Sequence, residues 1–289
     1  MKSVICYNNL ANFDYSHYGN FLFAQSVHNK DEVLFMATQK GVCHICGEDT
    51  ELTFEHVPPR QALNNLPTKI YAGEEVIKRS LANTLHDTAG LRYKNLQRGA
   101  GRHSLCRRCN NNTGSFYAPH YIEFVKHIAY KLSKENLAEI GSVSLETKEM
   151  NCLAVFKQII SMFCSTCSHD AFGGEFKEFL LDKENVQFDA KRWGVYLYIY
   201  KGNLSSSCSG LMSQLYKHSD NEPVQYSLVA VSEIVTYPLG MVLFDRNTQY
   251  PADQIGLDIS GMSNIQYGQK PHIKMDLPCL EHAAFMPGI

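Results

Sequence analysis

Two Cys-x-x-Cys pairs, Cys43/Cys46 and Cys106/Cys109, constrain this chain more than any other feature of its sequence. Gly47 follows the first pair, and a predicted helix follows the second, so each pair is expected to present two thiolates from a tight turn. Four thiolates from two turns match the tetrahedral ligand set of structural zinc. We therefore predict that Zn²⁺ joins the two turns through Cys43, Cys46, Cys106 and Cys109.

A third pair, Cys164/Cys167, differs in its setting. It ends an apolar helical stretch from Leu153 to Phe163, and it has no second pair to join. We interpret it as two packed thiols, with a redox role as the alternative. The chain has ten cysteines and shows no N-terminal export signal, which favours metal sites over disulfides.

Length and composition predict a soluble protein of two domains. The chain has 289 residues, about twice the length of a typical domain, and 44% of them are hydrophobic. It contains no apolar run of the ~18 residues that a membrane-spanning helix needs. We therefore expect a cytoplasmic protein that does not contact a membrane.

The order of helical and strand patterns along the chain predicts an α+β fold. Apolar residues recur at helical spacing from Tyr117 to Leu132 and again from about Met150 to Cys167, whereas Trp193–Tyr200, Tyr226–Val235 and Leu239–Phe244 are rich in aromatic and β-branched residues. We predict four segments: an N-terminal appendage (1–35), a zinc-containing domain with a basic insertion (36–135), a helical connector (136–184) and a β-rich C-terminal domain of unknown role (185–289).

The net charge of −2 hides a polarised chain. From Arg60 to Arg108 there are ten basic and three acidic residues, a net charge of +7, and the remainder carries −9. A basic segment of this kind suits a phosphate backbone. The candidate nucleic-acid contacts within it are Arg60, Arg92, Lys94, Arg98, Arg102, Arg107 and Arg108.

An acid–histidine pair lies between the two turns. Glu55 and His56 end a predicted strand that Pro58 closes, and Asn110 follows the second cysteine turn directly. A carboxylate and an amide oxygen can hold a hard divalent ion while an adjacent imidazole activates water. This set of groups is suited to phosphodiester hydrolysis, although Asn110 could also serve as a helix cap.

The pattern CxxC, Glu-His-Val-Pro, Leu-Cys-x-x-Cys-Asn-x-x-Thr-Gly resembles the zinc-knuckle branch of the HNH (ββα-metal) endonucleases. The resemblance covers about residues 40–118. It implies a zinc-stapled, treble-clef-like ββα core that grips one catalytic Mg²⁺ or Mn²⁺ ion, followed here by helices and the β-rich module. Members of the family hydrolyse DNA, and many stand-alone members serve restriction or antiphage defence.

The resemblance also implies a role for each site residue. His56 corresponds to the general base, and Glu55 and Asn110 correspond to ligands of the catalytic ion. The best candidate for the asparagine that steadies the histidine is Asn95. The chain departs from the family in having Glu55 where aspartate is usual and Thr113 where lysine is common.

Two alternatives to a self-sufficient nuclease remain open from the sequence. The chain could be a zinc-knuckle protein that binds nucleic acid without cleaving it. It could also be a nuclease subunit that is active only with a protein partner, which the C-terminal module would bind. The residues do not discriminate DNA from RNA.

Overall fold

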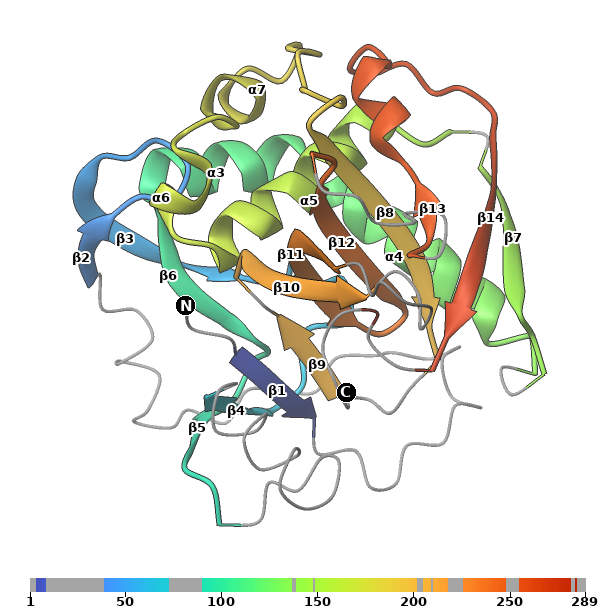
Figure 1. Cartoon of the computed structure of the whole chain (residues 1–289), viewed down its shortest axis with the longest axis horizontal. Coiled ribbons are helices and arrows are strands. Elements are labelled where there is room, and N and C mark those ends of the chain that lie inside the picture. Colours follow the sequence, from blue (N-terminus) through green and yellow to red (C-terminus); the bar gives the residue numbers. More distant parts are fainter. Residues whose placement is uncertain are drawn as a thin grey trace.

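The computed structural model describes residues 4–8, 39–72, 90–136, 139–147, 149–201, 205–208, 210–217, 226–247, 255–281 and 284. These residues form a mixed α+β fold in which helices cover one face of a large sheet (Figure 1). The basic residues Lys78 and Arg79 of the predicted insertion lie outside the described residues.

A small antiparallel sheet carries the two cysteine turns. Its strand order is β2-β3-β6, formed by Gln39–Val42, Asp49–His56 and Gly101–Cys106. The first turn connects β2 to β3, and helix α3 (Arg107–Phe116) begins directly after β6. The second pair therefore lies at the junction between strand and helix.

The large sheet has the strand order β5-β4-β1-β9-β11-β12-β8-β14-β7, with β10 paired to β11 and β13 paired to β8. Its strands are β1 (Val4–Asn8), β4 (Thr68–Ala72), β5 (Tyr93–Leu96), β7 (Ser142–Thr147), β8 (Trp193–Tyr200), β9 (Ser205–Cys208), β10 (Met212–Lys217), β11 (Tyr226–Thr236), β12 (Leu239–Asp245), β13 (Leu257–Asp258) and β14 (Ile273–Leu280).

This sheet takes strands from each of the four segments that the sequence separates. β1 belongs to 1–35, β4 and β5 belong to 36–135, and β7 belongs to 136–184. The segment predicted as a helical connector therefore also contains a strand, which pairs with β14. Its residues alternate between exposed and buried, the pattern of a strand with one face on the core.

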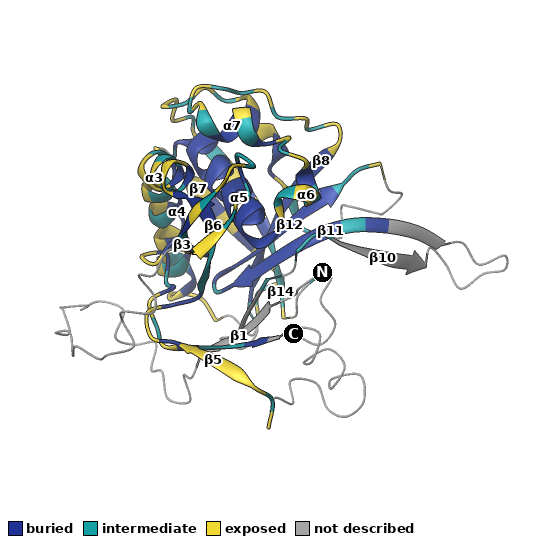
Figure 2. Ribbon diagram, turned by 90° about the vertical axis from the view of Figure 1, so that its left-hand side faces the viewer, coloured by how far each residue is buried: buried dark blue, intermediate teal, exposed yellow. Residues whose placement is uncertain are grey.

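Helices α4 and α5 confirm the predicted helical periodicity, and the structure adds three short helices that the sequence did not indicate. The bounds of these helices are Ala118–Leu132 (α4), Cys152–Thr166 (α5), His169–Phe172 (α6), Lys177–Leu181 (α7) and, for the 3-10 helix η3, Ser260–Asn264. All fifteen residues of α5 are buried, so this helix lies at the centre of the core (Figure 2). The ammonium of Lys157 on α5 donates to the carbonyls of Asp182 (2.6 Å) and Lys183 (3.1 Å) just beyond α7.

One hydrophobic cluster extends from the region of the two cysteine turns to the β-rich region. It includes Cys43 and Leu105 beside the first turn, Phe156 of α5, and Leu197 of β8. The tyrosines at positions 196, 198 and 200 belong to a second cluster, because alternate residues of β8 point to opposite faces of the sheet. The small sheet is thereby packed onto the same core as the β-rich part.

Candidate metal centre and candidate active site

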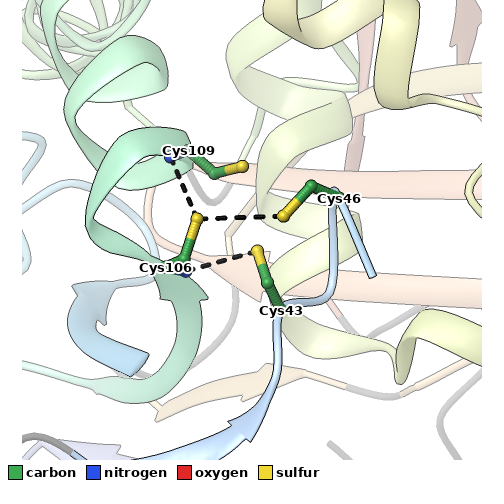
Figure 3. Close-up of side chains that lie close together, drawn as sticks. All are labelled: Cys43, Cys46, Cys106 and Cys109. Atoms are coloured by element: carbon green, nitrogen blue, oxygen red, sulfur yellow. Dashed lines mark hydrogen bonds between the residues drawn. The ribbon is translucent and has the colours of Figure 1, made fainter. Parts of the chain in front are cut away.

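The four predicted zinc ligands converge. The Sγ atoms of Cys43, Cys46, Cys106 and Cys109 all lie within 4.8 Å of one another (Figure 3). Sulfur atoms about 2.3 Å from a tetrahedral zinc ion would be about 3.8 Å apart, and the Sγ atoms of Cys46 and Cys106 are separated by 3.8 Å. The four cysteines are thus positioned to bind a metal ion, and an all-sulfur set of this shape suits structural Zn²⁺.

Backbone hydrogen bonds hold the two turns in this arrangement. The N–H of Gly47 donates to the carbonyl of Cys43 (2.9 Å), and Gly47 has a φ of +77°, which favours glycine. The N–H of Cys106 donates to the Cys43 sulfur at 3.2 Å, and the N–H of Cys109 donates to the Cys106 sulfur at 3.5 Å. Hydrogen bonds from the Cys109 thiol and the Cys106 N–H lower the pKa of Cys43, which favours the thiolate that binds metal.

The small sheet with its two cysteine turns is fastened to the C-terminal end of α5. The ring nitrogen Nδ1 of His44 lies 3.1 Å from the carbonyl of Cys164, and Arg102 Nη1 donates to the carbonyl of Thr166 at 2.8 Å. Cys164 and Cys167 are buried free thiols, in agreement with the packed-thiol interpretation. Burial raises the pKa of both thiols, so they are poor nucleophiles.

His56 ends β3, as the sequence predicts, and its imidazole is half-buried. Its Nε2 lies 3.2 Å from the carbonyl oxygen of Arg98. Because a carbonyl oxygen can only accept, this contact assigns the ring hydrogen to Nε2 and leaves Nδ1 as the acceptor in the neutral ring. Burial lowers the pKa of His56, which favours that neutral form.

Glu55 is a buried carboxyl group with 9% of its surface exposed. Burial raises its pKa to about 8. The Phe54 and His56 rings touch edge to face, with centroids 5.0 Å apart, so Glu55 between them points to the opposite face of β3. A divalent cation would offset the cost of ionising this carboxyl group. Glu55 and His56 thus leave β3 on opposite faces, and the described contacts of the Asn110 amide are with Thr53 and Phe54, not with the Glu55 carboxyl.

Asn110 lies in α3 and reaches the same strand. Its Nδ2 donates to Thr53 Oγ1 at 2.8 Å and to the carbonyl of Phe54 at 3.2 Å. The Phe54 carbonyl can only accept, and the Thr53 hydroxyl already uses its hydrogen to donate to the Leu105 carbonyl. Both groups therefore accept from Asn110, and the amide nitrogen must be the atom that faces them. The Asn110 Oδ1 atom therefore stays available as an oxygen ligand next to the strand that carries Glu55.

A different asparagine from the predicted one fastens the loop beside His56. Asn95 is exposed on β5, where it pairs with Lys69 of β4. Asn64 is buried, and its Nδ2 donates to the carbonyls of Pro58 (2.6 Å) and Ala100 (2.8 Å). Its Oδ1 accepts from the N–H of Ala100 at 2.7 Å. Asn64 thus joins the segment after His56 to the segment that contains the Arg98 carbonyl.

The close packing around Asn64 also explains Gly99. This glycine has a φ of +101°, and a Cβ atom there would lie 1.9 Å from the carbonyl oxygen of Asn64. The sequence contains a signal for this contact, since a glycine before Ala100 marks a close approach of two backbones. What the sequence does not indicate is which residue approaches it.

We expect Asn64→Ala to lower the free energy of unfolding by about 3 kcal/mol, because the Pro58 carbonyl and the Ala100 N–H lose their partner and the Ala100 carbonyl keeps only the Val57 N–H. We expect Asn95→Ala to change it by less than about 0.5 kcal/mol, because the side chain is exposed. Denaturant unfolding of both variants measures the difference. Equal effects would show that Asn64 does not hold the loop.

The predicted nucleic-acid contacts divide into two groups. Arg102 is half-buried, and its hydrogen bond to the Thr166 carbonyl at the end of α5 gives it a structural role besides the predicted one. The other side chains are exposed around the small sheet, α3 and β5: Arg60, Arg92, Lys94, Arg98, Arg107 and Arg108. Thr113 stands where lysine is common in the HNH pattern. Its side chain is buried, and its hydroxyl donates to the carbonyl of Cys109 at 3.0 Å.

Comparison of the chain with protein-family models, with curated proteins and with solved structures finds no match. Among the described residues, no helix combines the length and the apolar character needed to cross a membrane.

Proposed function

We propose that this protein is a metal-dependent endonuclease that hydrolyses DNA phosphodiester bonds. The observation that carries the proposal is the order β3, β6, α3, with Glu55 and His56 at the end of β3 and the Asn110 amide bonded to that strand. Two cysteine turns that suit zinc hold the strands and the helix together. A role in restriction or antiphage defence is part of the proposal and derives from the resemblance alone.

In this proposal His56 takes the proton of the attacking water on Nδ1. The Arg98 carbonyl holds Nε2–H, which orients the ring and leaves Nδ1 to accept. The lowered pKa supports this role, because a neutral imidazole is the form that can act as a base. Asn64 is the positioning residue, since it joins the two backbone segments on either side of the imidazole.

Glu55 and Asn110 would hold a catalytic Mg²⁺ or Mn²⁺ ion through carboxylate and amide oxygens, the ligands that hard divalent ions prefer. When bound, such an ion stabilises the charge that develops on the phosphate and the leaving 3′-oxygen. The buried Glu55 carboxyl supports the assignment, because its ionisation calls for a neighbouring positive charge. Zn²⁺ would serve only to join the cysteine turns.

We expect purified, zinc-loaded protein to nick supercoiled plasmid DNA with added Mg²⁺ or Mn²⁺ and to leave it intact without either ion. Agarose electrophoresis across both metals measures this. Binding of DNA with no cleavage under any metal would favour the non-catalytic alternative. Cleavage that requires an added cell fraction would favour a nuclease subunit that needs a partner.

A further inference from the structure

The small sheet carries a second imidazole, that of His103, on the same face as His56. β6 lies beside β3 (Figure 1), and His103 is the residue directly opposite Phe54. Directly opposite residues point to the same face of a sheet, and so do residues two apart in one strand. Phe54, His56 and His103 therefore share one face of the small sheet, and all three are half-buried there.

Ring contacts fix the spacing of these three side chains. The Phe54 and His56 centroids are 5.0 Å apart with the ring planes at 82°, and the Phe54 and His103 centroids are 5.4 Å apart with the planes at 76°. Both imidazoles thus meet the same phenyl ring edge to face. That ring lies over Gly101, where an added Cβ atom would come within 2.7 Å of it. The glycine therefore gives the Phe54 ring its place between the strands.

An irregularity in the strand pairing puts His103 on this face. In a regular ladder continued from the pair Thr53–Leu105, Phe54 would pair with Ser104. His103 would then point to the opposite face of the sheet. Phe54 instead pairs with His103, so Ser104 is an extra residue in β6, as in a β-bulge. Bulges occur next to active sites, where they re-aim a side chain, and this one aims an imidazole to the face of His56.

The two imidazoles are spaced as the base and the acid of an in-line displacement require. In hydrolysis the attacking water and the leaving 3′-oxygen lie on opposite sides of phosphorus. The base and the acid are then separated by the phosphate and by one hydrogen bond on each side, roughly 9 Å between their nitrogen atoms. Two imidazoles that contact one phenyl ring are spaced on this scale.

We infer that His103 is a catalytic residue, the general acid that gives a proton to the leaving 3′-oxygen. The inference rests on the proposed nuclease function and names the group that completes the leaving alcohol. As the bond from the water oxygen to phosphorus forms, His56 takes a proton from the water. As the bond from phosphorus to the 3′-oxygen breaks, His103 donates a proton to that oxygen. The products are a 5′-phosphate and a 3′-hydroxyl group, and proton exchange with solvent returns both imidazoles to their starting forms.

The chemistry of the leaving group provides a specific test of this role. An alkoxide leaves poorly, and a positioned acid accelerates such a step by a factor of about 10² to 10⁴. A thiol, with a pKa of about 8.5, ionises far more readily than an alcohol, so a thiolate leaves without a proton. Sulfur in place of the 3′-oxygen therefore removes the need for the acid and keeps the need for the base.

The experiment compares the two linkages in a labelled duplex of about two helical turns. The bond that the wild type cuts most often is mapped first, and a second duplex carries a 3′-S-phosphorothiolate at that bond. Both are cleaved with Mn²⁺ under single-turnover conditions, and gel electrophoresis gives the rates. His103→Phe keeps a ring against Phe54. We expect it to slow cleavage of the oxygen linkage at least about a hundredfold and cleavage of the sulfur linkage by less than about threefold.

Three further variants serve as controls. His103→Gln keeps an N–H donor but has no acidic proton, so it should be as slow as His103→Phe with the oxygen linkage. His56→Ala should stay slow with both linkages, because sulfur in the leaving group does not replace the base. His272→Gln replaces an exposed histidine just before β14 and should leave both rates unchanged. Zinc content and the unfolding midpoint check that each variant is folded.

The outcomes separate this inference from the proposed function. Wild-type cleavage with an equal loss on both linkages in His103→Phe overturns only the inference, since a role in packing or in orienting DNA would slow both. Unchanged cleavage of the oxygen linkage by His103→Phe, or full activity of His103→Gln, also overturns only the inference. No cleavage of either linkage by the wild type overturns the proposed nuclease function and the inference with it.

Discussion

Replacing His56 with alanine is expected to slow plasmid nicking about a thousandfold, within the range that a general base contributes. The reason is that no other group would take the proton of the attacking water at that position. Initial rates of supercoil loss at saturating Mg²⁺ measure the effect, with zinc content and the unfolding midpoint as checks that the variant is folded. Addition of free imidazole should restore part of the activity, because it supplies the missing base.

Two matched variants separate a chemical role of His56 from a structural one. His56→Gln keeps an N–H donor for the Arg98 carbonyl but has no basic nitrogen, so it should be as inactive as alanine. His127→Ala removes an exposed histidine on α4 and should leave the nicking rate unchanged. Full activity of His56→Gln would mean that the imidazole only fastens the loop, and the assignment of the base would then be wrong.

Loss of one zinc ligand is expected to unfold the zinc-containing region. Cys106→Ser removes a thiolate that belongs both to the metal cluster and to the start of α3, where its sulfur accepts from the Cys109 N–H. Metal binding energy becomes folding energy in such sites. We expect bound zinc to fall from about one ion per chain to a small fraction, and the unfolding midpoint to fall by about 10 °C.

Cys164→Ala is the matched control for this prediction. Its thiol is buried like that of Cys106, but it lies in α5 and belongs to no metal cluster among the described residues. The variant should keep its zinc and lose about 3 °C, the effect of a small cavity. Elemental analysis and calorimetry of the two variants give the comparison. A Cys106→Ser protein that retains zinc and stability would contradict the metal centre.

Local sequence patterns determined much of the secondary structure. The apolar repeats of α4 and α5 predicted both helices to within two residues, and the aromatic run Trp193–Tyr200 predicted β8 at its observed bounds. Proline after Glu55-His56 likewise predicted where β3 ends. These elements were predictable because helical and strand periodicity follow from which residues face a core.

The large sheet was not predictable in the same way. Its strand order joins β4 to β1 and β14 to β7, and these pairs come from segments that the composition of the chain separates. Backbone hydrogen bonds make such pairs and carry no side-chain signature of their partner. The alternation in β7 indicated a half-buried strand, but it contained no information on which strand would lie beside it.

The sequence by itself determined which four cysteines converge to a site that can bind a metal ion, and the chemical identity of the acid–histidine pair. Cysteine spacing suffices for the first, because each ligand pair lies on one tight turn. Only the tertiary structure decided that Asn64, instead of Asn95, fastens the loop beside His56, and that Arg102 binds the end of α5. Both outcomes depend on where a distant backbone carbonyl lies, and that position is set by the packing of the whole core.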